Sequence, residues 1–209
     1  MIFEVNSKKD KFIESIYNKG MKKFNDFFNL NVPKGKLKIF LIQSRKEINL
    51  LRGEKTENWI VGWSEQDIIF LLDRKKYEKF SSHKYSDKEY SCLILHEMVH
   101  FFHDQLSGVK SGPAWLNEGI AIFLSGQNKL KKKPVKFKKF LSFYDNYGKE
   151  IYNESGFVIE FLFTKFGKTK LIKLLKVANR NNKKDFYGKF KGIYGFDLNY
   201  NEINKRYRK

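Results

Sequence analysis

Three kinds of residue are scarce in this sequence: cysteine, proline and acidic side chains. Its 209 residues include one Cys and three Pro, and 42 Lys and Arg outnumber 23 Asp and Glu, which gives a formal net charge of +19. A single cysteine excludes an internal disulfide and is typical of a reducing compartment. The excess positive charge indicates either a polyanionic partner such as nucleic acid or a general abundance of lysine, and no nucleic-acid-binding motif accompanies it.

Long apolar runs are also missing. No stretch approaches the roughly 20 residues that a membrane-spanning helix needs. The first ten residues do not combine a charged start with a following apolar stretch, so they do not have the pattern of a signal peptide. The sequence therefore predicts a cytoplasmic protein without a transmembrane segment. Its length suits one domain over residues 1–209, which can bury a sizeable core.

The most informative motif is His96-Glu97-Met98-Val99-His100. Histidines four residues apart lie on one face of a helix, because a helix has about 3.6 residues per turn, and both imidazoles can then reach one metal ion. Glu97 can reach a water molecule on that ion. A helix over 87–106 is expected, since Ser86 and Glu89 form a capping-box pattern and no Gly or Pro interrupts the stretch.

A catalytic zinc site needs a third protein ligand and one open position. The segment Pro113-Ala114-Trp115-Leu116-Asn117-Glu118-Gly119 predicts a second helix that begins near Pro113. Glu118 lies there among apolar residues, and a buried carboxylate is costly unless it is paired or bound to metal. We therefore predict Glu118 as the third ligand; the alternative is a surface position on an amphipathic helix.

Together, H-E-x-x-H and the following W-L-N-E-G-x-A resemble the gluzincin metallopeptidases, specifically the compact peptidase-MA-like group. Seventeen residues separate His100 from Glu118, which is close to the spacing in gluzincin aminopeptidases and slightly shorter. A weaker similarity continues through Ile151–Phe157 and the segments that follow it, so the resemblance covers roughly residues 36–209.

The resemblance implies one Zn²⁺ per chain, held by His96, His100 and Glu118, and a peptide or protein substrate. Glu97 would be the general base, which takes a proton from water on the zinc and passes it to the leaving amine. Tyr152 is the candidate for a second group that stabilises the oxyanion, and the alternative is a core tyrosine on a helix face.

Three other positions bear on this site. Relatives carry an acidic residue four positions after the glutamate ligand, where it orients a zinc-bound histidine, but this chain has Ile122 there. Either another residue fills that role or zinc binds more loosely. Cys92 and His103 flank the motif, and a fourth protein ligand would close the site. We interpret Cys92 as a small buried residue and His103 as a packing residue or a partner of a ligand.

The whole chain predicts an α+β, gluzincin-like fold. An N-terminal lobe of about 1–107 holds a small mixed sheet with helices and the motif helix, a mostly helical lobe of about 108–209 follows, and the site lies between them. Ile68–Leu72 is the expected edge strand for an extended substrate, with a core strand as the alternative. The remaining expected elements are helices over 11–30, 45–52, 137–144, 151–166, 168–179, 185–193 and 200–209, strands over 36–43, 59–63 and 67–72, and a mobile basic loop over 129–135.

Two other functions stay open at this point. The chain could be an inactive metal-binding relative that serves as a protein-binding module. The charge also favours a DNA-associated metalloprotease resembling the SprT-like group, although that group uses a third histidine where this chain has Glu118.

Overall fold

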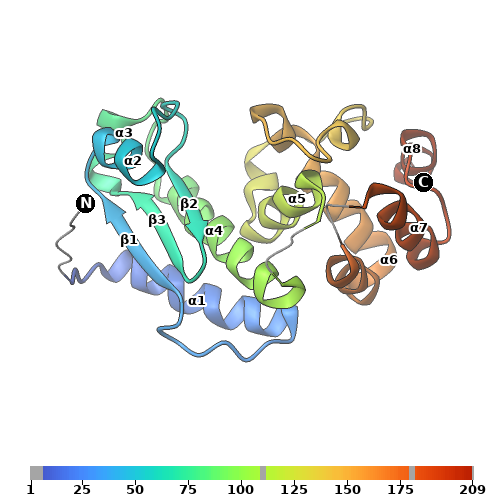
Figure 1. Ribbon diagram of the computed structural model, residues 1–209, viewed down its shortest axis with the longest axis horizontal. Coiled ribbons are helices and arrows are strands. Elements are labelled where there is room, and N and C mark those ends of the chain that lie inside the picture. The colour runs from blue at the N-terminus through green and yellow to red at the C-terminus, as the bar shows by residue number, and fades with distance from the viewer. Residues whose placement is uncertain (1–6, 109–111, 179–181, 209) are drawn as a thin grey trace.

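The computed structural model describes residues 7–108, 112–178 and 182–208. Within these ranges the chain forms eight α-helices and one three-stranded mixed sheet (Figure 1), which confirms the predicted α+β class. None of the described helices is both long and apolar enough to span a lipid bilayer.

The helices and strands have the following bounds in chain order. The helices are α1 (Lys11–Phe28), α2 (Arg45–Arg52), α3 (Tyr77–Phe80), α4 (Asp87–Ser107), α5 (Ala114–Ser125), α6 (Ser155–Val177), α7 (Lys183–Tyr194) and α8 (Tyr200–Tyr207). The strands are β1 (Lys38–Ile42), β2 (Gly62–Glu65) and β3 (Ile68–Leu72). Short 3-10 helices are η1 (Arg74–Lys76), η2 (Gln127–Leu130), η3 (Phe140–Ser142) and η4 (Lys149–Asn153).

The motif helix α4 begins where its sequence predicts. The Ser86 hydroxyl accepts a hydrogen bond from the Glu89 amide at 3.2 Å and donates one to the Glu89 carboxylate at 3.0 Å. These contacts satisfy a free amide of the first turn, so the helix start is fixed locally. The predicted helices over 11–30, 45–52, 185–193 and 200–209 are also confirmed, with small shifts at their ends, except that residue 209 lies outside the described residues.

The sheet has the order β1-β3-β2, in which β1 runs parallel to β3 and β2 runs antiparallel to it. The prediction that Ile68–Leu72 is a substrate-binding edge is therefore wrong. That segment is the central strand, because β1 and β2 occupy its two sides, and Ile69, Leu71 and Leu72 are buried. The alternative of a core strand is correct, and β2 is the edge strand that packs beside α4.

The hairpin between β2 and β3 is tighter than predicted. The sequence predicts a strand over 59–63, whereas β2 is Gly62–Glu65: residues 59–61 lie outside it, and it continues to Glu65, which pairs with Ile68. Only Gln66 and Asp67 form the turn, and Gln66 adopts a left-handed φ of 53°. The polar side chains of this segment are typical of a loop. Strand pairing, however, uses the backbone N–H and C=O groups, and every residue except proline has both.

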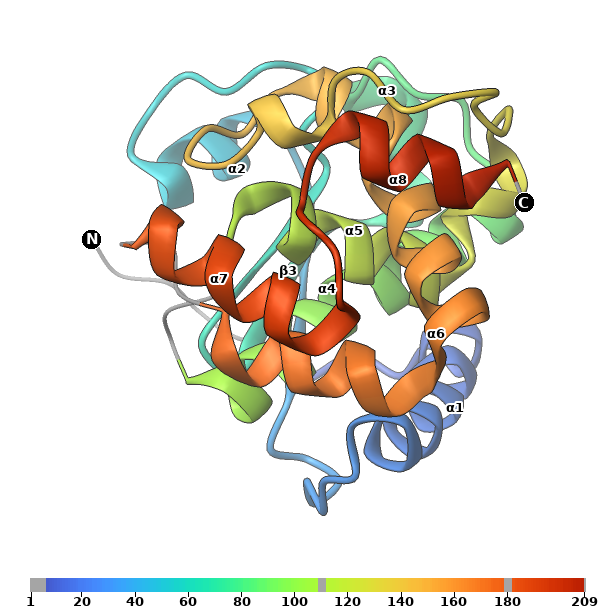
Figure 2. The same cartoon turned by 90° about the vertical axis from the view of Figure 1, so that its right-hand side faces the viewer.

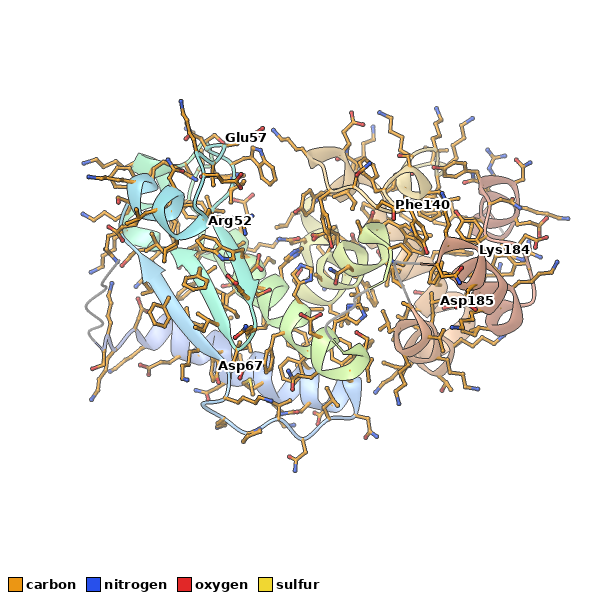
Figure 3. All side chains as sticks on the ribbon, in the orientation of Figure 1. Arg52, Glu57, Asp67, Phe140, Lys184 and Asp185 are labelled. Atoms are coloured by element: carbon orange, nitrogen blue, oxygen red, sulfur yellow. The ribbon has the colours of Figure 1, made fainter. Side chains whose placement is uncertain are left out.

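Helix α4 lies between the N-terminal elements and helices α5 and α6. Helix α1 and the sheet contact it on one side, and α5 and α6 contact it on another (Figure 1). One continuous apolar cluster includes Met98 of α4, Trp115 of α5 and Ile159 of α6. The ring centroids of Trp115 and Phe140 are 5.0 Å apart, and Figure 3 places Phe140 in the C-terminal part of the molecule.

The helix predicted over 137–144 is wrong, because only Phe140–Ser142 forms a single 3-10 turn. The Glu154 carboxylate accepts hydrogen bonds from the backbone amides of Lys138, Lys139 and Phe140 at 2.8 to 3.0 Å. The amide groups of this segment thus donate to Glu154 and not to backbone carbonyls of a helix.

The C-terminal helices are close to their predicted ranges. The two predicted helices on either side of residue 167 correspond to α6, which breaks at Gly167 (φ 83°, ψ 164°), while Ile151–Asn153 belongs to η4. Helix α7 packs on α6, and α8 lies beside them (Figure 2). The predicted basic loop begins inside η2, and the Tyr207 hydroxyl donates to the Pro134 carbonyl within it at 2.9 Å.

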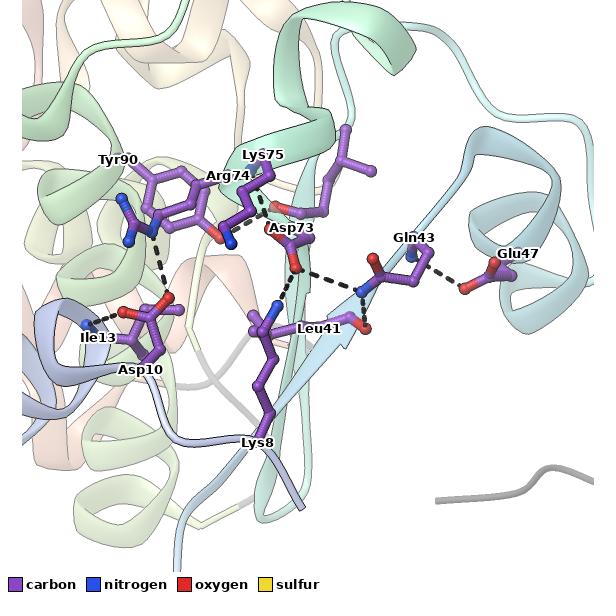
Figure 4. A network of polar contacts seen from close by, with 11 residues as sticks. Lys8, Asp10, Ile13, Leu41, Gln43, Glu47, Asp73, Arg74, Lys75 and Tyr90 are labelled. Atoms are coloured by element: carbon purple, nitrogen blue, oxygen red, sulfur yellow. Dashed lines mark hydrogen bonds and ion pairs between the residues drawn. The ribbon is translucent and has the colours of Figure 1, made fainter. Parts of the chain in front are cut away.

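A polar network ties the start of the chain to the end of β3 (Figure 4). The buried Asp73 carboxylate contacts the Lys8 ammonium and accepts hydrogen bonds from the Lys75 amide at 2.9 Å and the Gln43 side-chain amide at 3.4 Å. Asp10, which caps α1, accepts a hydrogen bond from Arg74 at 3.2 Å. These contacts anchor α1 to the sheet.

Candidate metal centre

His96 and His100 lie one turn apart on the central helix α4, and their ring nitrogens point at each other. The two Nε2 atoms are 3.0 Å apart, and the ring centroids are 4.7 Å apart. Both side chains are largely buried, which the packing of α5 and α6 around α4 explains.

Glu118 comes from α5 and meets both histidines. Its carboxylate oxygens lie 3.2 Å from His96 Nε2 and 3.6 Å from His100 Nε2. The three ligand atoms lie within 4.8 Å of one another, so the group could hold a metal ion. Glu118 is only 6 % exposed, which rules out the alternative of a surface carboxylate.

The donor atoms of this group fit a cation. His96 Nδ1 lies 3.0 Å from Gln127 Oε1, and His100 Nδ1 lies 3.3 Å from Asn117 Oδ1. Amide oxygens only accept hydrogen bonds, so both Nδ1 atoms carry the proton and both Nε2 atoms present lone pairs in the neutral rings. Two lone pairs and a carboxylate then converge on one point, and no group among the described residues donates a hydrogen bond to Glu118 Oε2. Such an arrangement is stable only with a positive charge at its centre.

The pKa shifts of His96 and Glu118 also indicate that a positive charge is favoured at this position. Burial lowers the pKa of His96, but the adjoining Glu118 carboxylate, Glu97 and the Gln127 amide together raise it more, and the net direction is upward. Burial raises the pKa of Glu118, but His100, His96 and the Tyr152 hydroxyl together lower it more, and the net direction is downward. A metal ion can supply the charge that a proton otherwise provides.

Two amide residues orient the histidines, and sequence patterns pointed to neither. Gln127 lies in η2 and contacts His96, in place of the acidic residue expected at Ile122, which is fully buried. Asn117 precedes Glu118 and contacts both His100 and His103, the latter at 3.0 Å. Its Nδ2 donates to the Tyr147 hydroxyl at 3.2 Å.

The two flanking residues of the motif fit their interpretations. Cys92 is buried on α4, and His103 is fully buried with its Nδ1 on Asn117 rather than on the ligand group. Burial lowers the pKa of His103 to about 4, so it is a neutral residue that packs beside the site.

Glu97 and Tyr152 lie on the open side of the ligand group. Burial raises the pKa of the Glu97 carboxyl, although His96 and His100 oppose this effect. The Tyr152 ring centroid is 6.2 Å from that of His96, and Tyr152 is close enough to Glu118 to lower the pKa of that carboxyl. Burial raises the pKa of Tyr152 above its usual range, so its hydroxyl keeps its proton. The structure thus brings every predicted site residue to one place.

A cleft of about 410 Å³ opens onto His96, Glu97 and Tyr152. One wall comes from the N-terminal part, including Trp59 to Gly62 and the His83–Lys84 loop, and the other comes from η2, η4 and Lys131. Burial lowers the pKa of Lys131 to about 8, against the opposing effect of Glu118. A second cavity of similar volume lies between α1 and β1 and contains none of the metal-site groups.

Comparison with known proteins does not identify a family for this chain. The sequence matches no protein-family model, and no curated protein matches it. The interpretation of the site therefore depends on its geometry and chemistry.

Proposed function

We propose that this chain is a zinc-dependent peptidase of gluzincin type, in which His96, His100 and Glu118 hold the ion. The observation that carries the proposal is the convergence of three ligand atoms beside a cleft that also contains Glu97 and Tyr152. Two histidines and one carboxylate leave a fourth position open, as hydrolytic zinc sites do. Zinc fits this mixture of imidazole and carboxylate ligands.

The residues around the ligand group have complementary roles in this proposal. A bound zinc ion supplies Lewis acidity, which polarises a peptide carbonyl and makes water acidic enough to attack near neutral pH. Glu97 accepts the proton of the attacking water and delivers it to the leaving amine. Tyr152 keeps its hydroxyl proton and donates a hydrogen bond to the developing oxyanion.

Strand β2 offers a place for the substrate backbone. It is an edge strand, it packs beside α4, and its first residue, Gly62, lines the cleft. An extended peptide can add to such an edge through main-chain hydrogen bonds, which hold the chain without dictating its sequence.

The proposal is tested by metal content and hydrolysis in matched variants. Wild type, Glu118→Ala and Glu97→Gln are purified without chelators, their zinc is measured by elemental analysis, and cleavage of an unstructured peptide mixture is followed by mass spectrometry. We expect about one zinc per chain in wild type and in Glu97→Gln, and loss of zinc in Glu118→Ala. Hydrolysis should fall by a factor of about 100 or more in Glu97→Gln.

Glu14→Gln is the control, because it removes an exposed carboxylate on α1. It should leave both zinc content and hydrolysis unchanged. No zinc in wild type after reconstitution, or cleavage that Glu97→Gln does not reduce, would contradict the proposal. Zinc binding without any cleavage would instead support a metal-binding protein that acts as a binding module.

A further inference from the structure

Most charged side chains that line the cleft are basic. Lys84, Lys131 and Lys149 line it, from the loop before α4, the segment after η2 and η4 respectively. The acids that line it are Glu97 and Glu89, and Glu89 accepts a hydrogen bond from the Ser86 hydroxyl at the start of α4. Apart from the general base, the cleft therefore presents an excess of positive charge to whatever enters it.

Lys131 contacts Tyr152, one of the residues proposed to act on the substrate. Its Nζ donates to the Tyr152 carbonyl at 2.8 Å and lies 5.2 Å from the centroid of the Tyr152 ring. The side chain is half-buried, and among the described residues no carboxylate lies within ion-pair distance of its ammonium. An ammonium has three donors, so at least one remains for a ligand in the cleft.

Glu118 acts on this ammonium only from beyond ion-pair distance, so a closer anionic ligand would offset the cost of its partial burial. Neither acid on the N-terminal side, Glu89 or Glu57, forms an ion pair with Lys131, and each accepts a hydrogen bond from another residue. The wall opposite Lys131 holds Trp59, whose ring centroid is 6.5 Å from that of Tyr152 and whose indole N–H donates to Glu57, a residue that Figure 3 places on the N-terminal part. The indole N–H is therefore occupied, and an incoming group meets Trp59 and Lys84 on one side and Lys131 and Lys149 on the other.

We propose that this cleft selects peptides that carry a carboxylate close to the bond to be cleaved, with Lys131 as the residue that binds it. This inference rests on the proposed peptidase function and adds a substrate class to it. Because Tyr152 contacts both Lys131 and the Glu118 region, the carboxylate belongs to a residue within a short distance of the scissile bond. Two sources share this chemistry: an acidic side chain and a free C-terminal carboxylate.

Binding of four short peptides to the zinc-loaded Glu97→Gln protein tests the proposal, because this variant should hold peptides without cleaving them. The first pair shares one neutral sequence and differs only in a free or amidated C-terminus. The second pair is amidated and differs only in Glu or Gln at the central position. We expect isothermal titration calorimetry to show that at least one carboxylate peptide binds about tenfold more tightly than its neutral partner.

Lys131→Gln, introduced into the same Glu97→Gln protein, tests whether the preference depends on the ammonium charge. Glutamine can still donate to the Tyr152 carbonyl, so the variant removes the ammonium while keeping that contact. We expect the carboxylate peptide and its neutral partner to bind this variant with about equal affinity, and its zinc content to be unchanged. Lys132→Gln removes the same charge from the next residue, which is exposed and does not line the cleft, and should keep the full preference. No preference in either pair, or a preference that survives Lys131→Gln, would overturn the inference.

Hydrolysis of the same peptides by the wild type separates this inference from the proposed function. Cleavage without any carboxylate preference would overturn the inference and leave the peptidase intact. A Lys131-dependent preference without cleavage would support a carboxylate-binding cleft and overturn the peptidase. A preference seen only in the first pair would mean that Lys131 binds the free C-terminal carboxylate of the substrate. A preference seen only in the second pair would mean that it binds an acidic side chain.

Discussion

At the scale of single residues, the histidines owe their orientation to two neutral amides. Gln127 and Asn117 place carbonyl oxygens at the Nδ1 atoms of His96 and His100. A hydrogen-bond acceptor at this nitrogen fixes the tautomer and turns the other nitrogen toward the ligand group. A neutral acceptor does so without adding negative charge to a site that already contains Glu97 and Glu118.

Gln127→Ala is expected to weaken zinc binding by about 10- to 100-fold, because His96 would lose the acceptor that fixes its tautomer and ring orientation. Competition with a chromogenic chelator measures this affinity. Gln105→Ala, which shortens an exposed glutamine at the far end of α4, is the control and should bind zinc as the wild type does. Equal affinities of all three proteins would show that Gln127 does not orient His96.

Asp73 gives a prediction about acid stability. Burial raises its pKa, but the Lys8 ammonium and the hydrogen bonds from Lys75 and Gln43 together lower it more, so the net direction is downward. A carboxyl with a lowered pKa in the folded state contributes stability in full above its unfolded pKa of about 3.9, and this contribution is lost as the pH falls through the folded pKa.

Asp73→Asn is therefore expected to lower the free energy of unfolding by about 1–3 kcal/mol at pH 7. Its difference from wild type should shrink when urea denaturation is repeated at pH values below about 4. Asp26→Asn, an exposed carboxylate in a surface pair with Lys22, should change stability much less at every pH. A difference for Asp73→Asn that stays constant from pH 7 to pH 3 would contradict this account.

At the scale of elements, the metal site depends on close packing between α5 and α6. Gly119 follows Glu118, and a Cβ atom added there would lie 2.6 Å from the Ser155 carbonyl oxygen and 2.7 Å from the Ile159 side chain. The first of these is backbone, which cannot rotate away. The missing side chain therefore lets α5 approach α6 and places Glu118 over the histidines of α4.

Gly119→Ala is expected to lower the free energy of unfolding of the metal-free protein by about 1–3 kcal/mol, because the helices must separate. Gly188→Ala is the matched control, since this glycine is also inside a helix but is exposed and has no atom within 4 Å of the added Cβ. There alanine should increase stability by up to about 1 kcal/mol through helix propensity. Thermal unfolding of both variants measures the contrast, and a stabilising Gly119→Ala would contradict the packing argument.

At the scale of the whole molecule, the ligand group joins two helices that belong to one continuous apolar cluster. His96 and His100 come from α4, which packs on the sheet and α1, and Glu118 comes from α5, which packs on α6. An ion held by both helices binds the folded chain and not the unfolded one, so it should stabilise the entire structure.

Zinc is therefore expected to raise the midpoint of a thermal unfolding transition followed by circular dichroism. Free zinc at about 100 times its dissociation constant contributes roughly 2.7 kcal/mol. The Glu118→Ala protein should show little shift under the same conditions, because it lacks one of the three ligands. An equal shift in both proteins would mean that zinc stabilises the chain at some other place.

Local patterns in the sequence determined the elements that carry the site. The capping box at Ser86, the histidine spacing in α4 and the apolar neighbours of Glu118 each act over a few residues, so the helices and the three ligand candidates could be predicted without a structure. The same locality explains the accurate ranges of α1, α2, α7 and α8, whose caps and apolar spacing lie within each helix.

Long-range contacts decided the rest. The Glu154 carboxylate accepts hydrogen bonds from the backbone amides of 138–140, so the helix predicted there does not form. Strand β3 is central instead of at an edge because β1 pairs with its second side. Gln127 meets His96 across 31 residues, and Lys131 meets Tyr152 across 21. Such contacts leave no periodic or spaced pattern in the chain, because they depend on how distant segments pack. The sequence by itself therefore determined which residues can bind a metal, and only the tertiary structure decided what orients them and which charges surround the cleft.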